Sequence, residues 1–479
     1  MKLEELSVVN PRRTWNAPPD RPVRAAVGRP PELAVPDHGA GMARERTTSK
    51  PASRWHALTR FRARSALLCA TLRPRAGRTL PNELRAENVG SLAEALPLGV
   101  HDAGFERLVG RIDTGPIHQG DHVQLFFRGE EAFASVRQAI EDATEEILLE
   151  TYILRDDATG RKLSRWLGDA AARGVRVRVL ADAYGSWTTK RAFWRELQSL
   201  GIEARLFHPF WSHLRGLLFR DHRKIIAIDR RISFTGGMNV ANEYGSSHHN
   251  KDASWRDTHV RVEGPTAWEM ALVFSEGWER SGGTSLHLPP LAPTDTGGAR
   301  ILVLDSRPGR GHAETAAVLA ALVAASRKRL WITNSYFAPN RTAIRLLGCA
   351  AQRGVDVRLL LQGRTDMPLV RHAGHGSFPD LLASGVRIFE YPSAILHAKT
   401  LVVDDYVSVV GSSNLDFRSF YFNAECNVLI FDDATGGTLA QTFQEDLGQS
   451  VEMRLEVWNQ RPLAHRLGDA LARCLSPLL

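Results

Sequence analysis

Residues 394–414 read AILHAKTLVVDDYVSVVGSSN, and they place a histidine and a lysine two positions apart at the start of an apolar strand. The stretch RDHRKIIAIDRRISFTGGMN, residues 220–239, has the same skeleton. Five positions match between the copies: His222, Lys224, Asp229, Gly236 and Asn239 correspond to His397, Lys399, Asp404, Gly411 and Asn414. Two copies of one pattern in one chain predict a duplicated fold.

The sequence that surrounds each copy repeats as well. Residues 132–186 and 314–366 each contain an amphipathic helix, a short apolar strand that ends near Tyr152 or Tyr336, a second helix and a strand rich in Val and Leu. Strands that alternate with helices predict an α/β layered architecture in each half. Order, spacing and motif position all agree, so the duplication extends over most of the chain.

Composition divides the 479 residues into three parts. The formal charge of +8 resides in residues 1–100, which hold 17 basic and 9 acidic residues, whereas the remainder holds 44 of each. We therefore expect residues 1–110 to be a basic, Pro- and Arg-rich segment that is largely disordered or loosely helical. The domains that follow are predicted at 111–290 and 300–479, because LPPLAPTDTGGAR between them is typical of a linker.

The paired histidines and lysines point to phosphodiester chemistry. Residues two apart on a strand share a face, so each histidine projects together with its lysine. If the halves pack about a pseudo-twofold axis, both pairs meet at one cleft. One imidazole can then attack phosphorus, while the other transfers protons. The chain has only eight lysines against 53 arginines, so lysine is kept where a compact charge suits the phosphate oxygens.

No metal or cofactor is predicted for this protein. Neither copy contains a cluster of His, Cys and carboxylates at the spacing of a metal site, and no P-loop or dinucleotide fingerprint is present.

The motif resembles the HxKx4Dx6GSxN signature of the phospholipase D superfamily. Longer stretches, including LLETYILRDDATG, LHAKTLVVDD, GSSNLDFRS and NAECN, resemble bacterial cardiolipin synthases of the soluble, membrane-associated type. The resemblance covers roughly residues 115–479. It implies two tandem phospholipase D-like α/β/α sandwich domains, related by pseudo-twofold symmetry and sharing a single active site.

The resemblance also implies a role for each motif residue. The catalytic set would be His222 as nucleophile, His397 as general acid and base, Lys224 and Lys399 on the phosphate, and the motif aspartates Asp229 and Asp404 in a mainly structural role. The phosphate-binding set would be Asn239, Asn414 and Ser412. Asp257 and Glu425 would orient the histidines, and they lie 35 and 28 residues after their histidines. Gly237 departs from the motif, which has Ser there.

Several functions fit the resemblance. The first is a phosphatidyltransferase that makes cardiolipin from phosphatidylglycerol through a phosphohistidine and releases glycerol. The alternative is a phospholipase D in which water takes the place of the acceptor lipid. A superfamily nuclease is disfavoured by the balanced charge of residues 101–479, because nucleic-acid grooves are strongly basic. A non-enzymatic scaffold would have a broken site, and both motif copies are complete.

The expected partners are a phospholipid substrate and a membrane surface, without nucleic acid; no oligomeric state is predicted. No run of 18 apolar residues occurs, so we predict no transmembrane span and a peripheral place on the cytoplasmic face of the membrane. Two stretches mix apolar and basic residues, 207–220 and 461–479. They suit either an interfacial patch or core packing.

Overall fold

The computed structural model of the chain describes residues 89–112, 115–209, 219–245, 254–289, 298–306 and 314–476. Most of the predicted basic segment therefore lies outside the described residues, as does the greater part of the aromatic and basic stretch at 207–220. None of the described helices is both long and apolar enough to cross a lipid bilayer.

The described strands form one sheet built from two matching halves. In spatial order, the first half-sheet contains β1 (His118–Phe126), β7 (His259–Glu263), β6 (Ile232–Gly236), β5 (Ile225–Ile228), β2 (Glu146–Thr151), β3 (Arg176–Asp182) and β4 (Glu203–Phe207). The second contains β8 (Ala299–Ser306), β14 (Glu425–Phe431), β13 (Val407–Gly411), β12 (Lys399–Val403), β9 (Arg329–Asn334), β10 (Asp356–Arg364), β11 (Arg387–Ile395) and β15 (Val451–Met453). The orders agree strand for strand, apart from the additional edge strand β15.

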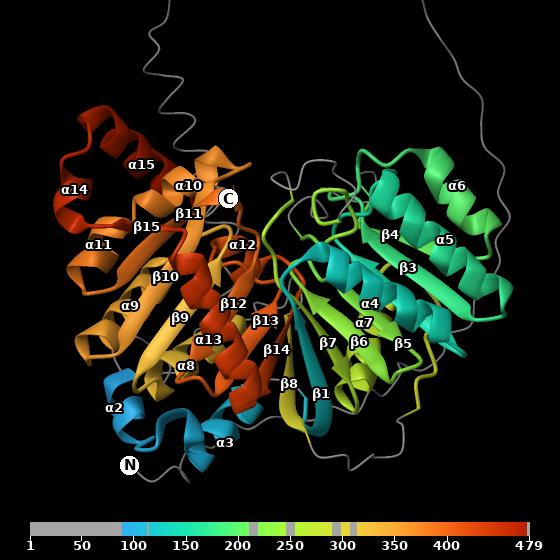
Figure 1. Ribbon diagram of the computed structural model, residues 1–479, viewed down its shortest axis with the longest axis horizontal. Helices are drawn as coiled ribbons and strands as arrows, with labels where there is room; N and C mark the ends of the chain where they lie inside the picture. The colour runs from blue at the N-terminus through green and yellow to red at the C-terminus, as the bar shows by residue number, and fades with distance from the viewer. Residues whose placement is uncertain are drawn as a thin grey trace, which may run out of the picture. The chain divides into compact units, whose positions relative to one another are not determined.

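The two half-sheets join through an antiparallel pairing of β1 with β8, in which His118 lies opposite Ile301. Figure 1 shows these two strands side by side where the halves meet. Because each half begins with the strand that pairs, the junction brings equivalent edges together. This arrangement agrees with the pseudo-twofold relation expected from the duplicated sequence.

Crossover helices connect the parallel strands in each half. β2, β3 and β4 are parallel to one another, as are β9, β10 and β11. The crossover from β2 to β3 is α5 (Ala158–Ala172), and the crossover from β9 to β10 is α9 (Arg341–Gln352). Each helix begins with a side-chain cap: Asp157 accepts from the backbone N–H of Gly160, and Asn340 accepts from that of Ala343.

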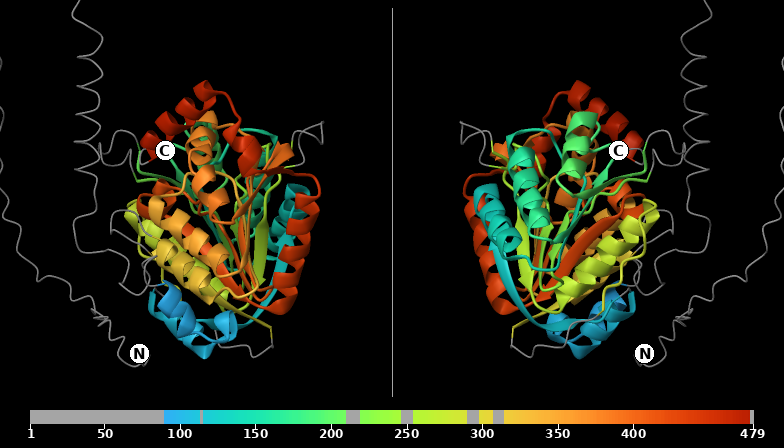
Figure 2. Two further views of the ribbon diagram at one scale, coloured as in Figure 1. Left: turned by 90° about the vertical axis from the view of Figure 1, so that its left-hand side faces the viewer. Right: turned by 90° about the vertical axis from the view of Figure 1, so that its right-hand side faces the viewer.

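Helices cover both faces of the sheet (Figure 2). One face of the first half packs against α4 (Gly129–Asp142), α5 and α6 (Arg191–Ser199). One face of the second packs against α8 (Glu314–Ala325), α9 and α11 (Phe378–Ala383). The remaining faces share a single apolar cluster with α7 (Thr266–Arg280) and α13 (Asp433–Leu447). The predicted α/β/α sandwiches are confirmed, and a common core runs across their junction.

Four further helices complete the second half. The short α12 (Phe417–Tyr421) follows β13, whereas α10 (Pro368–His375) and α15 (Leu463–Leu475) pack together and α14 (Leu455–Asn459) contacts α11. Their packing extends the second half toward the C-terminus of the chain.

Part of the segment expected to be disordered is folded. Within residues 89–112, α2 (Val89–Glu94), the 3-10 turn η3 (Gly99–His101) and α3 (Ala103–Ile112) pack against α8. Phe105 and Val109 are fully buried there. The physical reason lies in α8, in which every residue from Ala316 to Ala325 is apolar and buried. A helix that is apolar all round must be packed on every side, and α2, η3 and α3 pack against the side that the sheet leaves open. The domain boundaries at 110, 290 and 300 stay a prediction.

Candidate active site

Backbone hydrogen bonds between the halves fix the position of both histidines. The backbone N–H of His222 donates to the carbonyl oxygen of Ala424 at 2.8 Å, and that of His397 donates to Arg256 at 2.7 Å. Each histidine thereby lies beside the residue that precedes a carboxylate of the opposite half. The two contacts are equivalent, as the duplication requires.

The carboxylates pair with the histidines crosswise. His222 Nδ1 lies 3.0 Å from Glu425 Oε2, and His397 Nδ1 lies 2.7 Å from Asp257 Oδ2. From the sequence we expected each carboxylate to orient the histidine of its own half. The structure shows that this expectation was wrong, because each carboxylate pairs with the histidine of the other half. An Nδ1–H that donates to a carboxylate leaves Nε2 of a neutral imidazole with its lone pair available for chemistry.

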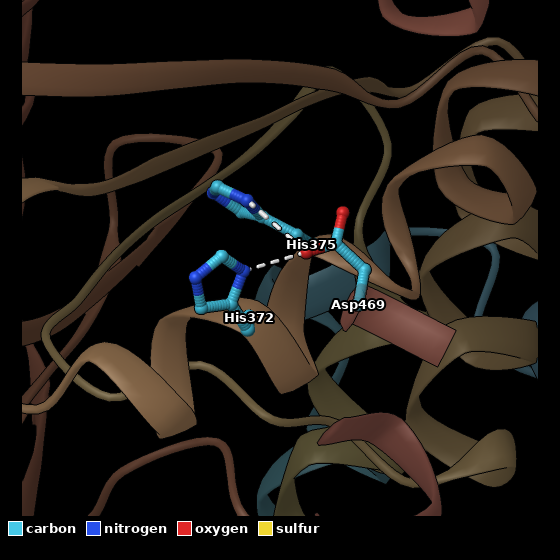
Figure 3. Close-up of side chains that lie close together, drawn as sticks. All are labelled: His372, His375 and Asp469. Atoms are coloured by element: carbon cyan, nitrogen blue, oxygen red, sulfur yellow. Dashed lines mark hydrogen bonds and ion pairs between the residues drawn. The ribbon is translucent and has the colours of Figure 1, made fainter. Parts of the chain in front are cut away.

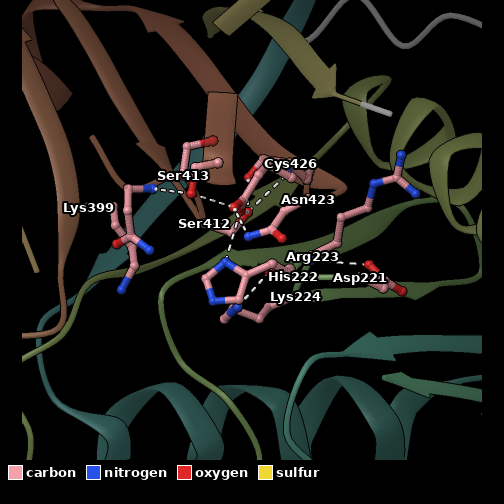
Figure 4. Close-up of polar contacts among 12 residues, drawn as sticks. Asp221, His222, Arg223, Lys224, Lys399, Ser412, Ser413, Asn423 and Cys426 are labelled. Carbon is pink, nitrogen blue, oxygen red and sulfur yellow. Dashed lines mark hydrogen bonds and ion pairs between the residues drawn. The ribbon is translucent and has the colours of Figure 1, made fainter. Parts of the chain in front are cut away.

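Both motif copies contribute to one buried centre. Figure 4 shows His222 and Lys224 from the first half lying together with Lys399 and Ser412 from the second. The charge of Lys399 lowers the pKa of His222, and the charge of Lys224 lowers the pKa of His397, which are effects across the junction. The expected single shared site is therefore supported by the electrostatic coupling of the two copies.

Two tyrosines line this centre in equivalent places. The ring centroid of Tyr152 lies 4.9 Å from that of His222, and the ring centroid of Tyr336 lies 5.8 Å from that of His397. Lys224 Nζ lies 5.6 Å from the Tyr152 ring centroid and donates to the carbonyl oxygen of His222 at 2.5 Å. The aromatic walls exclude water from the ammonium groups and strengthen their charges locally.

Burial dominates the titration of these groups. It lowers the pKa of Lys224 to about 8 and that of Lys399 to about 7. Burial and the nearby Lys399 lower the pKa of His397 to about 3, and burial also lowers the pKa of His222. Both imidazoles are therefore neutral at pH 7 in the ligand-free site.

The two carboxylates stay ionised. Burial raises the pKa of Glu425, but His222 and Lys224 outweigh it, so the pKa is lowered overall. The pKa of Asp257 is lowered in the same way, because His397 and Lys399 outweigh burial. Two ammonium groups thus face two carboxylates. An anionic phosphodiester that enters such a balanced centre favours the uptake of a proton.

Comparisons with known proteins place this site in a family. The family described as "Cardiolipin synthase, PLD-like domain" matches residues 136–263 and 319–447. A cardiolipin synthase of Geobacillus sp. (strain WCH70) is 34% identical over 397 residues, which cover 81% of this chain and 78% of the relative. That of Halalkalibacterium halodurans is 34% identical over 395 residues, covering 80% and 77%. The chain belongs to the cardiolipin synthase family of the phospholipase D superfamily.

A solved structure agrees on the fold. The phosphatidylserine synthase of Haemophilus influenzae Rd KW20 superposes with a TM-score of 0.62 at 14% identity, covering 78% of this chain and 100% of that chain. At this identity the likeness supports the tandem architecture alone.

Within the family motif, the side chain of Ser412 forms a hydrogen bond with a buried carboxylate. Its hydroxyl donates to Glu425 Oε2 at 2.6 Å, and the hydroxyl of Ser419 donates to Glu425 Oε1 at 2.7 Å. A hydroxyl has one hydrogen to donate, and here that of Ser412 is directed to the carboxylate; its predicted contact with phosphate stays a prediction. Ser419 was not singled out from the sequence; the signal was the serine that follows the asparagine motif in GSSNLDFRS.

The glycine that departs from the family motif has a steric reason. A Cβ atom at Gly237 would lie 2.0 Å from Asp257 Oδ1. The carboxylate that orients His397 occupies the space that the serine side chain fills in the second copy. Gly237 is therefore matched to Asp257, and the departure is not a defect of the site.

The motif asparagines hold the loops around the centre. Asn239 accepts from the backbone N–H of Ile153 at 3.1 Å and donates to the Tyr244 hydroxyl at 2.9 Å. Asn414 accepts from the hydroxyl of Ser335 at 2.8 Å. Both side chains are buried. Their predicted contact with phosphate stays a prediction.

The motif aspartates lie away from the catalytic centre. Asp229 accepts from the backbone N–H groups of Thr144, Glu145 and Glu146, each at 2.8 Å. Asp404 makes the equivalent contacts with residues 327–329. Each aspartate follows its lysine by five residues, about 16 Å along a strand. The mainly structural role expected for both aspartates fits these contacts.

A buried ion network stabilises the segment that carries His222 and was missed from the sequence. Arg223, which is 1% exposed, pairs with Asp305 of the second half and lies 3.5 Å from Glu150. Asp182 accepts from the backbone N–H of Asp221 at 2.9 Å. Arginines are common throughout this chain, so nothing in the sequence distinguished Arg223 from solvated neighbours.

Restoring the family serine is expected to damage the site. Gly237→Ser brings its Cβ against Asp257, displaces the carboxylate from His397 and lowers the rate of phosphodiester cleavage about 10–100-fold. Steady-state kinetics with Gly237→Ala as a second variant measure the effect, since alanine adds the Cβ alone. Full activity in both variants would show that Asp257 can move without loss.

Anion binding is expected to weaken as the pH rises. Tungstate keeps a constant charge above neutral pH, whereas Lys399 and Lys224 lose their protons through pKa values of about 7 and 8. Affinity should fall by about tenfold per pH unit near pH 8 and more steeply toward pH 9, with the uptake of one to two protons on binding. Calorimetry in buffers of different ionisation enthalpy measures both quantities. Lys399→Gln should flatten the profile, and a wild-type profile that is already flat would contradict the lowered pKa values.

Proposed function

We propose that this protein is a phosphatidyltransferase that makes cardiolipin from phosphatidylglycerol through a phosphohistidine and releases glycerol. The observation that carries the proposal is the crossed pairing of His222 with Glu425 and of His397 with Asp257 in one site that contains both motif lysines. Membership of the cardiolipin synthase family supports the choice of a lipid phosphodiester.

The first chemical step forms a covalent intermediate. His222 Nε2 attacks the phosphorus of phosphatidylglycerol, a P–N bond forms, and the P–O bond to the headgroup glycerol breaks. His397 gives a proton to the departing oxygen, so glycerol leaves as a neutral alcohol. Lys224 and Lys399 stabilise the charge that builds on the non-bridging oxygens.

The second step transfers the phosphatidyl group. A hydroxyl of another phosphatidylglycerol attacks the phosphorus while His397 takes its proton. The P–N bond then breaks, which restores neutral His222 and yields cardiolipin. Because acceptor and leaving group are both primary alcohols of glycerol, the same proton-transfer residue serves both steps in opposite directions.

The protonation of His397 depends on the substrate. Its pKa of about 3 in the ligand-free site makes it neutral there. The phosphodiester anion adds a negative charge beside the imidazole and raises this pKa. The acid therefore forms when the substrate is bound, and the empty site keeps no additional buried charge.

A polar cavity that shares Trp255 with the surroundings of His397, but that none of the motif histidines or lysines lines, suits a polyol headgroup. Trp255 forms part of its wall, and the Trp255 ring centroid lies 5.1 Å from that of His397. The cavity has a volume of about 720 Å³, within the usual range for ligand sites. Its polar lining consists of Arg155, Asp156, Asp157, Thr188, Lys190, Asn242, Glu243 and Asp366. Hydroxyl groups of glycerol can both donate to and accept from such side chains.

The assay that tests the function follows labelled phosphatidylglycerol in mixed micelles with the purified protein. Cardiolipin and glycerol in equal amounts are expected. His222→Ala and His397→Ala should each lose essentially all turnover, since each removes one of the two groups that bond making requires. His465→Ala removes an exposed histidine of α15 and serves as the matched control.

Two outcomes of this assay would contradict the proposal. Phosphatidic acid without cardiolipin would assign hydrolysis in place of transfer. Near-normal turnover in either histidine variant would contradict the paired-histidine mechanism. Glu425→Gln and Asp257→Asn extend the test, because the crossed pairs require each to impair the histidine of the opposite half.

We further propose that the protein binds a membrane surface through α15. Leu463, Leu467 and Leu471 recur every fourth residue on one face of this helix, and their side chains are 71%, 64% and 66% exposed. Met367 and Leu369, at the start of the neighbouring α10, are each 46% exposed. An exposed apolar stripe with adjacent Arg466 is typical of helices that lie in the lipid interface.

The cysteines support a cytoplasmic side for the proposed membrane contact. Cys349, Cys426 and Cys474 are all unpaired thiols in the described part of the chain. Unpaired thiols are usual on the reducing, cytoplasmic side of a membrane. This supports the proposed place on the cytoplasmic face.

Charged substitutions in the stripe are expected to weaken membrane binding. Leu467→Glu combined with Leu471→Glu should reduce cosedimentation with phosphatidylglycerol vesicles at least about tenfold, because two leucines lose about 1.5–3 kcal/mol each of apolar burial. Turnover of a short-chain, water-soluble phosphatidylglycerol should be retained. Leu98→Glu, at an equally exposed leucine away from α15, is the control. Unchanged vesicle binding of the double variant would exclude α15 as the contact.

A further inference from the structure

A second cluster of titratable side chains lies outside the active site, between α10 and α15. His372 and His375 are three residues apart on α10, so they share a face of the helix, and Asp469 of α15 lies opposite them (Figure 3). His372 Nδ1 is 2.7 Å from Asp469 Oδ1, and His375 Nδ1 is 4.0 Å from the same oxygen. The three ligand atoms lie within 4.8 Å of one another.

The tautomer of His375 is fixed from its other side. His375 Nε2 lies 2.7 Å from Glu390 Oε1. Arg371 Nη2 donates to the other oxygen of the same carboxylate at 2.6 Å, so Glu390 is held as the acceptor of the hydrogen bond from His375 Nε2. In a neutral ring, Nδ1 then carries a lone pair that faces the Asp469 oxygen. Two acceptors face each other, and a cation between them would bond to both.

We propose that Nδ1 of His372, Nδ1 of His375 and Oδ1 of Asp469 bind a divalent transition metal of the Zn²⁺ class. Two imidazoles and one carboxylate are a usual zinc ligand set, with a fourth position open to water. A carboxylate behind a ligating histidine, as Glu390 is here, is the usual outer support of such a site. His372 is exposed, which gives the metal an entry path.

The geometry needs only side-chain adjustment. Tetrahedral bonds of about 2.0–2.1 Å place neighbouring ligand atoms about 3.3 Å apart. The two separations of 2.7 and 4.0 Å bracket that value. The exposed His372 can rotate, whereas Asp469 is 2% exposed and held in place.

Arg461 sets the strength of the site. Its Nη2 lies 2.9 Å from Asp469 Oδ2, so it fixes the second carboxylate oxygen and leaves Oδ1 toward the histidines. The guanidinium charge also opposes a nearby cation, so modest affinity is expected. A bound metal would connect α10 to α15, the helix that carries the exposed leucine stripe. The site is independent of the proposed lipid chemistry.

Zinc titration of the full chain tests the proposal. The protein is prepared without a polyhistidine tag, stripped with a chelator and titrated with ZnCl₂ in a calorimeter, with CoCl₂ absorption as the spectroscopic signature of imidazole ligands. One Zn²⁺ per chain and a higher unfolding temperature are expected. Glu390→Gln should weaken binding about 10–100-fold. His372→Ala should abolish stoichiometric binding and the thermal shift, and His465→Ala, an exposed histidine of the same helix as Asp469, should leave both unchanged.

Each contrary result is decisive. Absence of zinc binding by the wild-type chain would overturn the proposal and leave the cluster as a hydrogen-bonded contact between helices. Binding that survives in His372→Ala would locate the metal elsewhere, with the imidazoles of His222 and His397 as the alternative ligands. Since His372 is exposed, its replacement is not expected to prevent folding.

Discussion

The hydrogen bond that joins each motif imidazole, His222 or His397, to a carboxylate of the opposite half is the constraint on which the site depends. Within the site, neither half completes a histidine–carboxylate pair by itself, because Glu425 pairs with His222 and Asp257 pairs with His397. An ionised carboxylate buried without its partner costs several kcal/mol, so the halves gain their charge compensation only when they are joined. The continuous sheet through β1 and β8 and the shared apolar core keep that junction closed.

The same constraint explains how a buried centre tolerates so many charges. Glu425 and Asp257 balance Lys224 and Lys399, while burial keeps the histidines neutral until an anion arrives. Lowered lysine pKa values follow from burial, and they place the ammonium groups close to the point of losing charge at physiological pH. A centre of this kind binds a phosphodiester together with a proton. In the proposed mechanism, His397 therefore becomes protonated in the same event in which the substrate binds.

The sequence predicted the features that repeat and missed those that cross between halves. Alternating apolar segments and the two motif copies were enough to predict the layered, duplicated fold, whereas the catalytic roles of His222 and His397 stay a prediction. The carboxylate pairing was assigned within each half because spacing along the chain carries no information about which strand lies opposite. The hydrogen bond from the Ser412 hydroxyl to Glu425 was missed for the same reason, because the motif position of Ser412 indicated only a phosphate ligand. The helices of residues 89–112 were missed because composition was averaged over a longer basic segment.

The duplication has also diverged, and the divergence separates the two histidines. Glu425 accepts from His222 and from two serine hydroxyls, whereas Asp257 accepts from His397 and from the backbone N–H of Thr258. The shorter aspartate reaches its histidine only because Gly237 leaves room for it. An imidazole whose partner is held by several donors is well suited to attack from one fixed position. An imidazole against a single short carboxylate, with a pKa that the substrate can raise, is suited to carrying the proton, and this asymmetry favours His222 as nucleophile.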